Sequence, residues 1–180
     1  MDRNQAGLSL VELVVACALL ALLATLALPG AARLLAEAEA ERTLHRVNAA
    51  LAYARYLAVT EDRAVVLCPL RPDGECGGRW SDGFAVFPDP EREARLSPGS
   101  IPLRVFEGSG VRVVLRAFRT TRYFRFLRNG QTDWQNGRFV VCPDRPAVPA
   151  RSLVVNVQGR ARIERPATHH PACDQEAGVP

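Results

Sequence analysis

The sequence predicts an α+β protein in which one long N-terminal helix packs on an antiparallel, β-rich head. An apolar run covers residues 8–28, and apolar residues continue at helical spacing to about residue 60. From residue 64 onward the spacing changes to that of strands. Asn129-Gly130 and Gly108-Ser109-Gly110 are typical hairpin connections, which favour antiparallel pairing. The 180 residues allow one domain with its own core and an N-terminal extension.

Residues 1–7 form a short polar leader, and residues 8–29 are expected to form a transmembrane helix that also polymerises. The apolar run is about twenty residues long, which is enough to span a bilayer as a helix. A secretory signal peptide has a basic start, a shorter apolar core and a small-residue cleavage site, which this segment lacks. A buried helix of a soluble protein fits poorly, because only Cys17 and Thr25 interrupt residues 13–28.

Glu12 is the most informative residue of this run. A carboxylate inside an apolar helix is costly and is usually paired. A single transmembrane helix that serves only as an anchor does not need this carboxylate. A helix that packs beside related helices can pair it with a neighbour's free amino terminus, created by cleavage after Gly7.

Residues 30–62 are expected to form the amphipathic half of the same helix. Pro29-Gly30 should kink or loosen the helix without ending it. The stripe predicted to pack on a sheet consists of Leu44, Val47, Leu51, Ala54 and Ala58.

Residues 63–180 are predicted to form the β-rich globular head. Strands are expected at 64–70, 83–87, 103–107, 111–118, 123–127, 138–142 and 152–157, with an extension at 162–164.

Four of the five cysteines are expected to form two disulfides. Cys17 lies in the apolar run and is expected to be a small buried hydrophobe. The other four lie in the polar part, and an exported domain meets an oxidising environment. Three pairings are possible. Cys68 with Cys76 closes a short loop and is favoured, which leaves Cys142 with Cys173.

The sequence contains no recognisable catalytic constellation, so an enzyme is not expected, and neither is a cofactor or metal. There is no phosphate-binding glycine motif, and no nucleophile with suitably spaced histidine and carboxylate partners. Metal ligation by Cys173 with His169 and His170 is the alternative to the second disulfide.

The arginines are concentrated in one part of the chain. All 23 basic residues are arginine, and the net charge of the chain is +4. Residues 101–165 hold thirteen arginines and four carboxylates, which gives this segment a charge of +9. Six of them recur among aromatic residues: Arg112, Arg116, Arg119, Arg122, Arg125 and Arg128. They fit the solvated outer face of a half-buried sheet or a cationic binding surface.

A second cationic site is predicted at residues 156–162, NVQGRAR, with Arg160 and Arg162 at its centre and Arg165 and Arg151 in support. Gly159 permits a turn with positive φ, and Arg160 and Arg162 project together if that turn leads into a strand. Guanidinium groups bind phosphate oxygens bidentately, and a phosphate backbone requires repeated cations without base-specific chemistry. A hairpin turn with two solvated arginines is the alternative.

The N-terminal segment resembles the class III signal of type IV pilins and of type II secretion pseudopilins. The match is GLSLVE at residues 7–12, the apolar length that follows, and Pro29. The resemblance implies that a prepilin peptidase cleaves between Gly7 and Leu8 and methylates the amino group of Leu8, and that Glu12 serves assembly. The implied partners are major and minor pilins. The implied location is the bacterial inner membrane, as a single-pass protein with its head in the periplasm, and then a pilus on the cell surface.

Nearly the whole chain resembles the GspH/FimT family of minor pilins. The resemblance rests on the WSDG turn at residues 80–83, the aromatic turn GQTDWQNG at residues 130–137, and the final strand running into GRAR. It implies a type IV pilin-like fold with the long helix on two small β-sheets. FimT-like members that bind DNA in natural transformation carry GRxR near the C-terminus, so the resemblance places non-specific DNA binding on Arg160 and Arg162. A GspH-like pseudopilin of a type II secretion system, or a minor pilin that only primes assembly, has the same anchor and fold.

Overall fold

The computed structural model describes residues 9–168 and 170–174, except for the side chains of residues 24 and 26–29. The predicted leader, Gly7 and Leu8 lie outside the described residues. The chain forms two compact units, Met1–Leu35 and Ala36–Pro180, which are described separately.

The first unit is helical. From Leu10 onward its residues belong to α1 (Leu10–Thr60), which continues through Pro29-Gly30 without ending, as predicted. Within the described part of the chain, no helix has both the length and the apolar character needed to cross a membrane. Cys17 is exposed, so the expectation of a buried side chain is wrong. The physical reason is that no other described element of this unit packs on the helix around Cys17.

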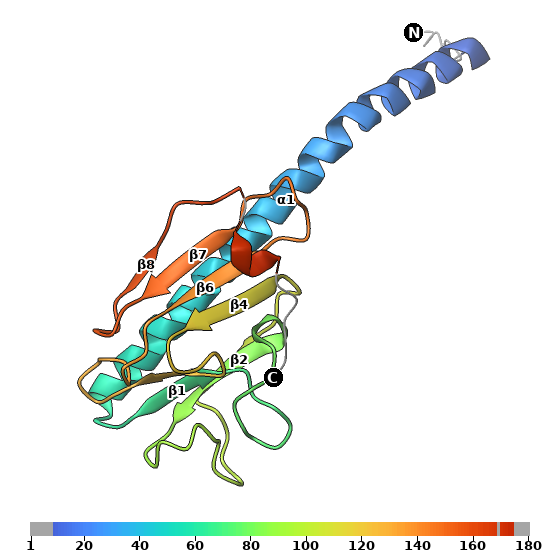
Figure 1. Ribbon diagram of the computed structural model, residues 1–180. Coiled ribbons are helices and arrows are strands. Elements are labelled where there is room, and N and C mark those ends of the chain that lie inside the picture. Colours follow the sequence, from blue (N-terminus) through green and yellow to red (C-terminus); the bar gives the residue numbers. More distant parts are fainter. Residues whose placement is uncertain (1–8, 169, 175–180) are drawn as a thin grey trace, which may run out of the picture. The chain divides into compact units, whose positions relative to one another are not determined.

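The second unit contains two four-stranded antiparallel sheets (Figure 1). The first sheet has the order β3-β2-β1-β5, formed by β1 (Val65–Cys68), β2 (Gly83–Pro88), β3 (Arg104–Glu107) and β5 (Phe124–Phe126). The second has the order β4-β6-β7-β8, formed by β4 (Arg112–Ala117), β6 (Gly137–Cys142), β7 (Arg151–Val155) and β8 (Ala161–Ile163). The predicted strands all occur, each within two residues of its expected bounds. The predicted fold class is therefore confirmed.

One hydrophobic core joins the C-terminal half of α1 to the inner faces of both sheets. The five residues predicted to form the helix stripe are all buried. Figure 1 shows this part of α1 behind the strands of the second sheet. The buried hydrophobic residues lie between Ala40 and Ala172, so the second unit has a complete core of its own.

Trp80 connects the two sheets inside this core. It begins a short 3₁₀ helix, Trp80–Asp82. Its ring centroid lies 5.7 Å from that of Phe84 on β2 and 4.9 Å from that of Phe139 on β6. The indole Nε1 donates a hydrogen bond to Thr121 O at 3.0 Å. The WSDG turn thus supplies an aromatic contact between the sheets and satisfies its own polar atom.

Both favoured disulfides are present, Cys68–Cys76 and Cys142–Cys173. Each one attaches a covering segment to the outer face of a sheet, because Cys68 lies on β1 and Cys142 on β6. Closing loops of these lengths stabilises a fold by about 2–4 kcal/mol each. The bond to Cys142 also removes Cys173 as a metal ligand, and His169 lies outside the described residues.

Arg125 is the most deeply buried charged group among the described arginines. It is 3% exposed, on the outer face of the first sheet. Its Nε donates to Asp89 Oδ2 at 2.9 Å, and its Nη1 donates to Asp133 Oδ2 at 3.0 Å. Burial alone lowers the pKa of Arg125, but the negative charge of Asp89 and the hydrogen bonds that the guanidinium donates to both carboxylates outweigh it and raise that pKa above its ordinary value. The guanidinium is therefore a permanently charged partner for Asp89, which is 2% exposed.

We predict that Arg125→Met lowers the free energy of unfolding of the second unit by about 3–5 kcal/mol, because it leaves the carboxylate of Asp89 buried without its partner. Urea denaturation of residues 36–180 measures the loss. Arg128→Met is the matched control, since Arg128 is exposed. Equal losses in the two variants would show that the buried pair does not stabilise the fold.

Candidate nucleic-acid interface

The segment predicted to bind phosphate forms the end of the β7–β8 hairpin. Gly159 N donates to Asn156 O at 2.9 Å, and Asn156 N donates to Arg160 O at 3.1 Å. Arg160 N also donates to Asn156 Oδ1 at 2.9 Å. Gly159 has a φ of +74°, the left-handed conformation that completes a three-residue hairpin loop. The predicted turn with positive φ is confirmed, and it leads directly into β8.

Close packing fixes the position of this turn. A Cβ atom at Gly159 would lie 2.3 Å from Gly130 O, so the contact requires glycine. Arg55 Nε, from α1, donates to the same oxygen at 3.0 Å. Thr132 N donates to Val157 O at 2.9 Å. The turn is therefore held against the β5–β6 loop, which is in turn bonded to α1.

Arg160 and Arg162 are exposed on the outer face of the second sheet. Arg162 is the register partner of Val154, whose neighbours on either side in β7 are buried in the core. Strand alternation then places Val154, Arg162 and Arg160 on the face away from the core. The side chain of Arg162 is 78% exposed, and its Nη2 lies 3.6 Å from Glu164 Oε1. The predicted projection of the two arginines from one face agrees with this register.

The two supporting arginines lie in different environments. Arg165 is exposed, three residues beyond Arg162. Arg151 lies on the inner face of β7, where its Nε is 3.2 Å from Glu41 Oε2 of α1 and its side chain is 19% exposed. The structure brings Arg160 and Arg162 together and leaves Arg151 apart from them.

The six arginines of residues 111–128 fall into two groups: three whose side chains bond to the rest of the head, and three for which the structure shows mainly solvent exposure. Arg112 donates to Cys173 O, Arg122 donates to Cys76 O at 2.7 and 3.0 Å, and Arg125 is buried. These three stabilise the fold. The other three are exposed: Arg116, Arg119 and Arg128. A solvated face is therefore the wrong description for Arg125, because Asp89 and the loop that follows it cover that position.

The roles of two residues that hold the turn were not predicted from the sequence. Asn156 accepts the Arg160 N–H through its side chain, and an Asn at the start of a hairpin loop is a local signal for this role. Arg55 contacts Gly130 across 75 residues of sequence, and no local pattern indicates such a contact.

The described residues offer no site for a metal. No three or more His, Cys, Asp or Glu side chains within that part of the chain are grouped closely enough to hold an ion. His170 Nδ1 accepts a hydrogen bond from Ala172 N at 3.2 Å. The chemistry that the hairpin can provide is the binding of anions by guanidinium groups.

Glu12 lies in the first turn of α1 and is exposed. Its surroundings along the helix are exposed apolar side chains: Leu10, Val11, Leu13, Val14 and Val15. The pairing of this carboxylate with a neighbouring helix stays a prediction.

Comparisons with known proteins identify two matching families. The model of the family described as type II transport protein GspH matches residues 43–159, and the prokaryotic N-terminal methylation motif matches residues 2–28. The first match ends at Gly159, immediately before Arg160. No curated protein matches the chain.

Solved structures of a minor pilin share the fold. Two crystal forms of the type IV minor pilin FimU of Pseudomonas aeruginosa are each 23% identical in sequence to this chain, with TM-scores of 0.54 and 0.55. The alignments cover 74% and 75% of this chain, and 98% and 95% of the FimU chains. At this identity the likeness establishes the shared architecture.

We predict that Gly159→Ala lowers the free energy of unfolding by more than about 2 kcal/mol, because it adds a steric conflict with Gly130 O to the strain of a positive φ. Gly99→Ala is the matched control. Gly99 has a φ of +78°, and its added Cβ atom would meet nothing within 4 Å. Chemical denaturation of residues 36–180 compares the two. A Gly159 variant that loses no more stability than the Gly99 variant would contradict the importance of the contact.

Proposed function

The chain belongs to the GspH family of minor pilins and pseudopilins, and on this premise we propose that it is a type IV minor pilin whose head binds DNA non-specifically for natural transformation. In this proposal a prepilin peptidase cleaves after Gly7 and methylates Leu8. Residues 8–29 hold the protein in the inner membrane, with its head in the periplasm, until it is assembled with other pilins into a pilus.

The observation that carries the DNA-binding proposal is the rigid hairpin that presents Arg160 and Arg162 on one face. The hydrogen bonds of Asn156 and the tight contact at Gly159 hold the backbone, so the backbone loses little conformational entropy when the side chains bind a ligand. Each guanidinium can bind a phosphate group through two parallel hydrogen bonds. Arg165, which is exposed, extends the same cationic surface along the chain.

The charge distribution of the head supports the same ligand. Residues 101–165 carry a net charge of +9, whereas the whole chain carries +4. Such a segment attracts a polyanion over a distance, and binding then releases the counterions of the DNA. Contacts from arginine to phosphate fix the position of DNA without reading its sequence, which favours non-specific binding.

A second candidate is a minor pseudopilin of a type II secretion system, which would have no DNA ligand. The description of the matching family as type II transport protein favours this candidate. The anchor and fold are common to both. The C-terminal arginines distinguish the two, because only the DNA-binding pilin requires them.

We predict that the head, residues 36–180, retards duplex DNA of any sequence and that its affinity falls steeply as the salt concentration rises. Replacing Arg160 and Arg162 by Gln should weaken binding at least about tenfold and reduce the slope of the log–log salt plot by about 2, because two phosphate contacts are lost. A gel-shift titration at several salt concentrations measures both quantities.

The control for this experiment is the double variant Arg79→Gln/Arg95→Gln, which removes the same charge from the loops of the first sheet. An equal loss of binding in the control would show that the net charge of the head determines its DNA affinity and that Arg160 and Arg162 do not form a specific site. A head that binds no DNA at low salt would favour the secretion candidate.

We predict that Glu12→Ala leaves leader cleavage intact but lowers incorporation into the fibre severalfold, because the helix loses the carboxylate that would pair with a neighbouring amino terminus. Immunoblots of sheared fibres and of membranes measure incorporation and cleavage. Glu39→Ala, at an exposed position of the same helix, is the control. Normal incorporation of the Glu12 variant would exclude this role.

A further inference from the structure

Two rows of side chains cross the outer face of the second sheet. The first row ends at Arg162 and the second at Arg160. The register of β4, β6, β7 and β8 places Arg116 opposite Arg138, Arg138 opposite Val154, and Val154 opposite Arg162. We call this set the arginine row. Three of its four positions carry a guanidinium. Neighbouring strands lie about 4.8 Å apart, so the row extends about 14 Å across the sheet.

A second row lies beside the first and combines an aromatic side chain, two amides and one guanidinium. Phe118 N donates to Asn136 O at 2.9 Å, which continues the β4–β6 ladder by one step. Asn156 N donates to Arg160 O at 3.1 Å, which continues the β7–β8 ladder in the same way. Phe118, Asn136 and Asn156 therefore lie alongside the arginine row, and this second row ends at Arg160.

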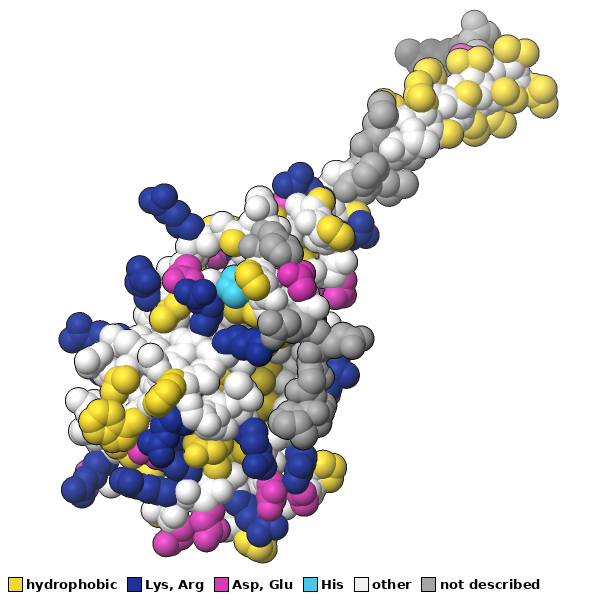
Figure 2. All heavy atoms as spheres, viewed as in Figure 1, with side chains coloured by type: hydrophobic (Ala, Val, Ile, Leu, Met, Phe, Trp, Pro, Cys, Tyr) yellow, Lys and Arg dark blue, Asp and Glu magenta, His cyan; other side chains and the backbone are white. Residues whose placement is uncertain are grey.

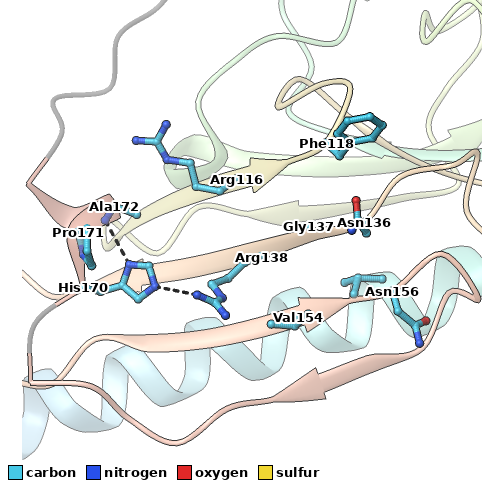
Figure 3. A pocket seen from close by; sticks show the side chains of 11 residues that line it. Arg116, Phe118, Asn136, Gly137, Arg138, Val154, Asn156, His170, Pro171 and Ala172 are labelled. Atoms are coloured by element: carbon cyan, nitrogen blue, oxygen red, sulfur yellow. Dashed lines mark hydrogen bonds between the residues drawn. The ribbon is translucent and has the colours of Figure 1, made fainter.

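An open groove follows the part of the two rows that belongs to β4, β6 and β7, and it ends before Arg160 and Arg162, which do not line it. It has a volume of about 660 Å³, and its lining includes Arg116, Phe118, Asn136, Arg138 and Asn156. Figure 3 shows Arg116 on β4 and Arg138 on β6, with their guanidinium groups pointing in different directions and His170 beside Arg138. Phe118, Asn136 and Asn156 lie one residue beyond the ends of their strands. Figure 2 shows arginine side chains spread over the face of the head seen from the same side as Figure 1. The face is thus both hollowed and cationic.

The carboxylate of Glu164 contacts two arginines of the row. Glu164 Oε1 lies 3.1 Å from Arg138 Nη2 and 3.6 Å from Arg162 Nη2, and Ser152 Oγ donates to Glu164 Oε2 at 2.9 Å. Glu164 therefore holds two members of the row near each other and neutralises part of their charge. Arg138 and Arg162 together carry one more charge than the carboxylate that they share.

We propose that the outer face of the second sheet is itself a binding site for a phosphodiester backbone, in which Arg138 and Arg116 take the phosphates that follow those held by Arg160 and Arg162. The site rests on the proposed DNA-binding function and extends it from one hairpin to a surface that crosses four strands. About 14 Å of cationic row corresponds to roughly four nucleotide steps of one strand at 3.4 Å per step. Because the row is positively charged, the ligand that we propose is a polyanion. Because the row crosses the strands, we propose that the phosphodiester backbone also runs across the strands.

The test is a titration of residues 36–180 with duplex and single-stranded oligonucleotides of equal length. Arg116→Gln/Arg138→Gln should weaken binding at least about tenfold and reduce the salt slope by about 2, as expected for two lost phosphate contacts. Arg116→Gln alone should give about half of that slope change; Arg116 is exposed, so this variant keeps the test valid if the double variant unfolds. The Arg79→Gln/Arg95→Gln head is the charge-matched control.

A gain of affinity provides an independent readout. Glu164→Gln removes the negative charge beside Arg138 and Arg162 while keeping an acceptor for Ser152, so affinity should rise by about threefold or more at low salt. A larger effect of the variants on the duplex than on the single strand assigns the face to duplex DNA, and the reverse assigns it to single strands.

Affinity unchanged by Arg116→Gln/Arg138→Gln, in a head that loses binding with Arg160→Gln/Arg162→Gln, would overturn the extended site and leave the proposed function standing. A wild-type head that binds neither oligonucleotide would overturn the proposed function itself.

Discussion

The rest of the head depends on the packing of one helix stripe against two sheets. Between residues 40 and 58, α1 buries a stripe in which alanines alternate with larger side chains. Small residues at Ala40, Ala50, Ala54 and Ala58 let the strands approach the helix closely, while Leu44, Val47 and Leu51 fill the space between the sheets. Because both sheets place their inner side chains on the same stripe, each keeps an outer face that other segments cover or leave open.

The outer faces of the two sheets are covered by different segments and to different extents, and the candidate site lies on the face of the second sheet. The first sheet buries Arg125 under Asp89 and the following loop, and the Cys68–Cys76 bond secures its covering. On the second sheet, the tail attached by Cys142–Cys173 packs on the side chains near Val140, and its residues His170–Ala172 form one side of the groove. The outer face of the first sheet thus buries an arginine, Arg125, whereas that of the second exposes Arg116 and Arg162.

The hairpin between β7 and β8 shows how the fold supports a function that it does not dictate. Gly159 and Asn156 fix the backbone, and the loop packs on Gly130, which is bonded to Arg55 of the helix. The side chains that follow the glycine carry no core contacts, so their identity is not restricted by the fold. A pilin scaffold and a cationic surface are separable properties of this chain.

The sequence by itself determined the long helix, the strands to within two residues, the hairpin at Gly159 and both disulfides. These features follow from local periodicity, from turn chemistry and from the small number of possible cysteine pairings. It also singled out Arg160 and Arg162 as a pair, because they are two residues apart on one strand. Only the tertiary structure decided that Arg125 is buried while Arg116 and Arg138 share a row with Arg162. The physical reason is that strand register and the segments that cover a face join residues distant in the sequence, and alternation within one strand cannot reveal either.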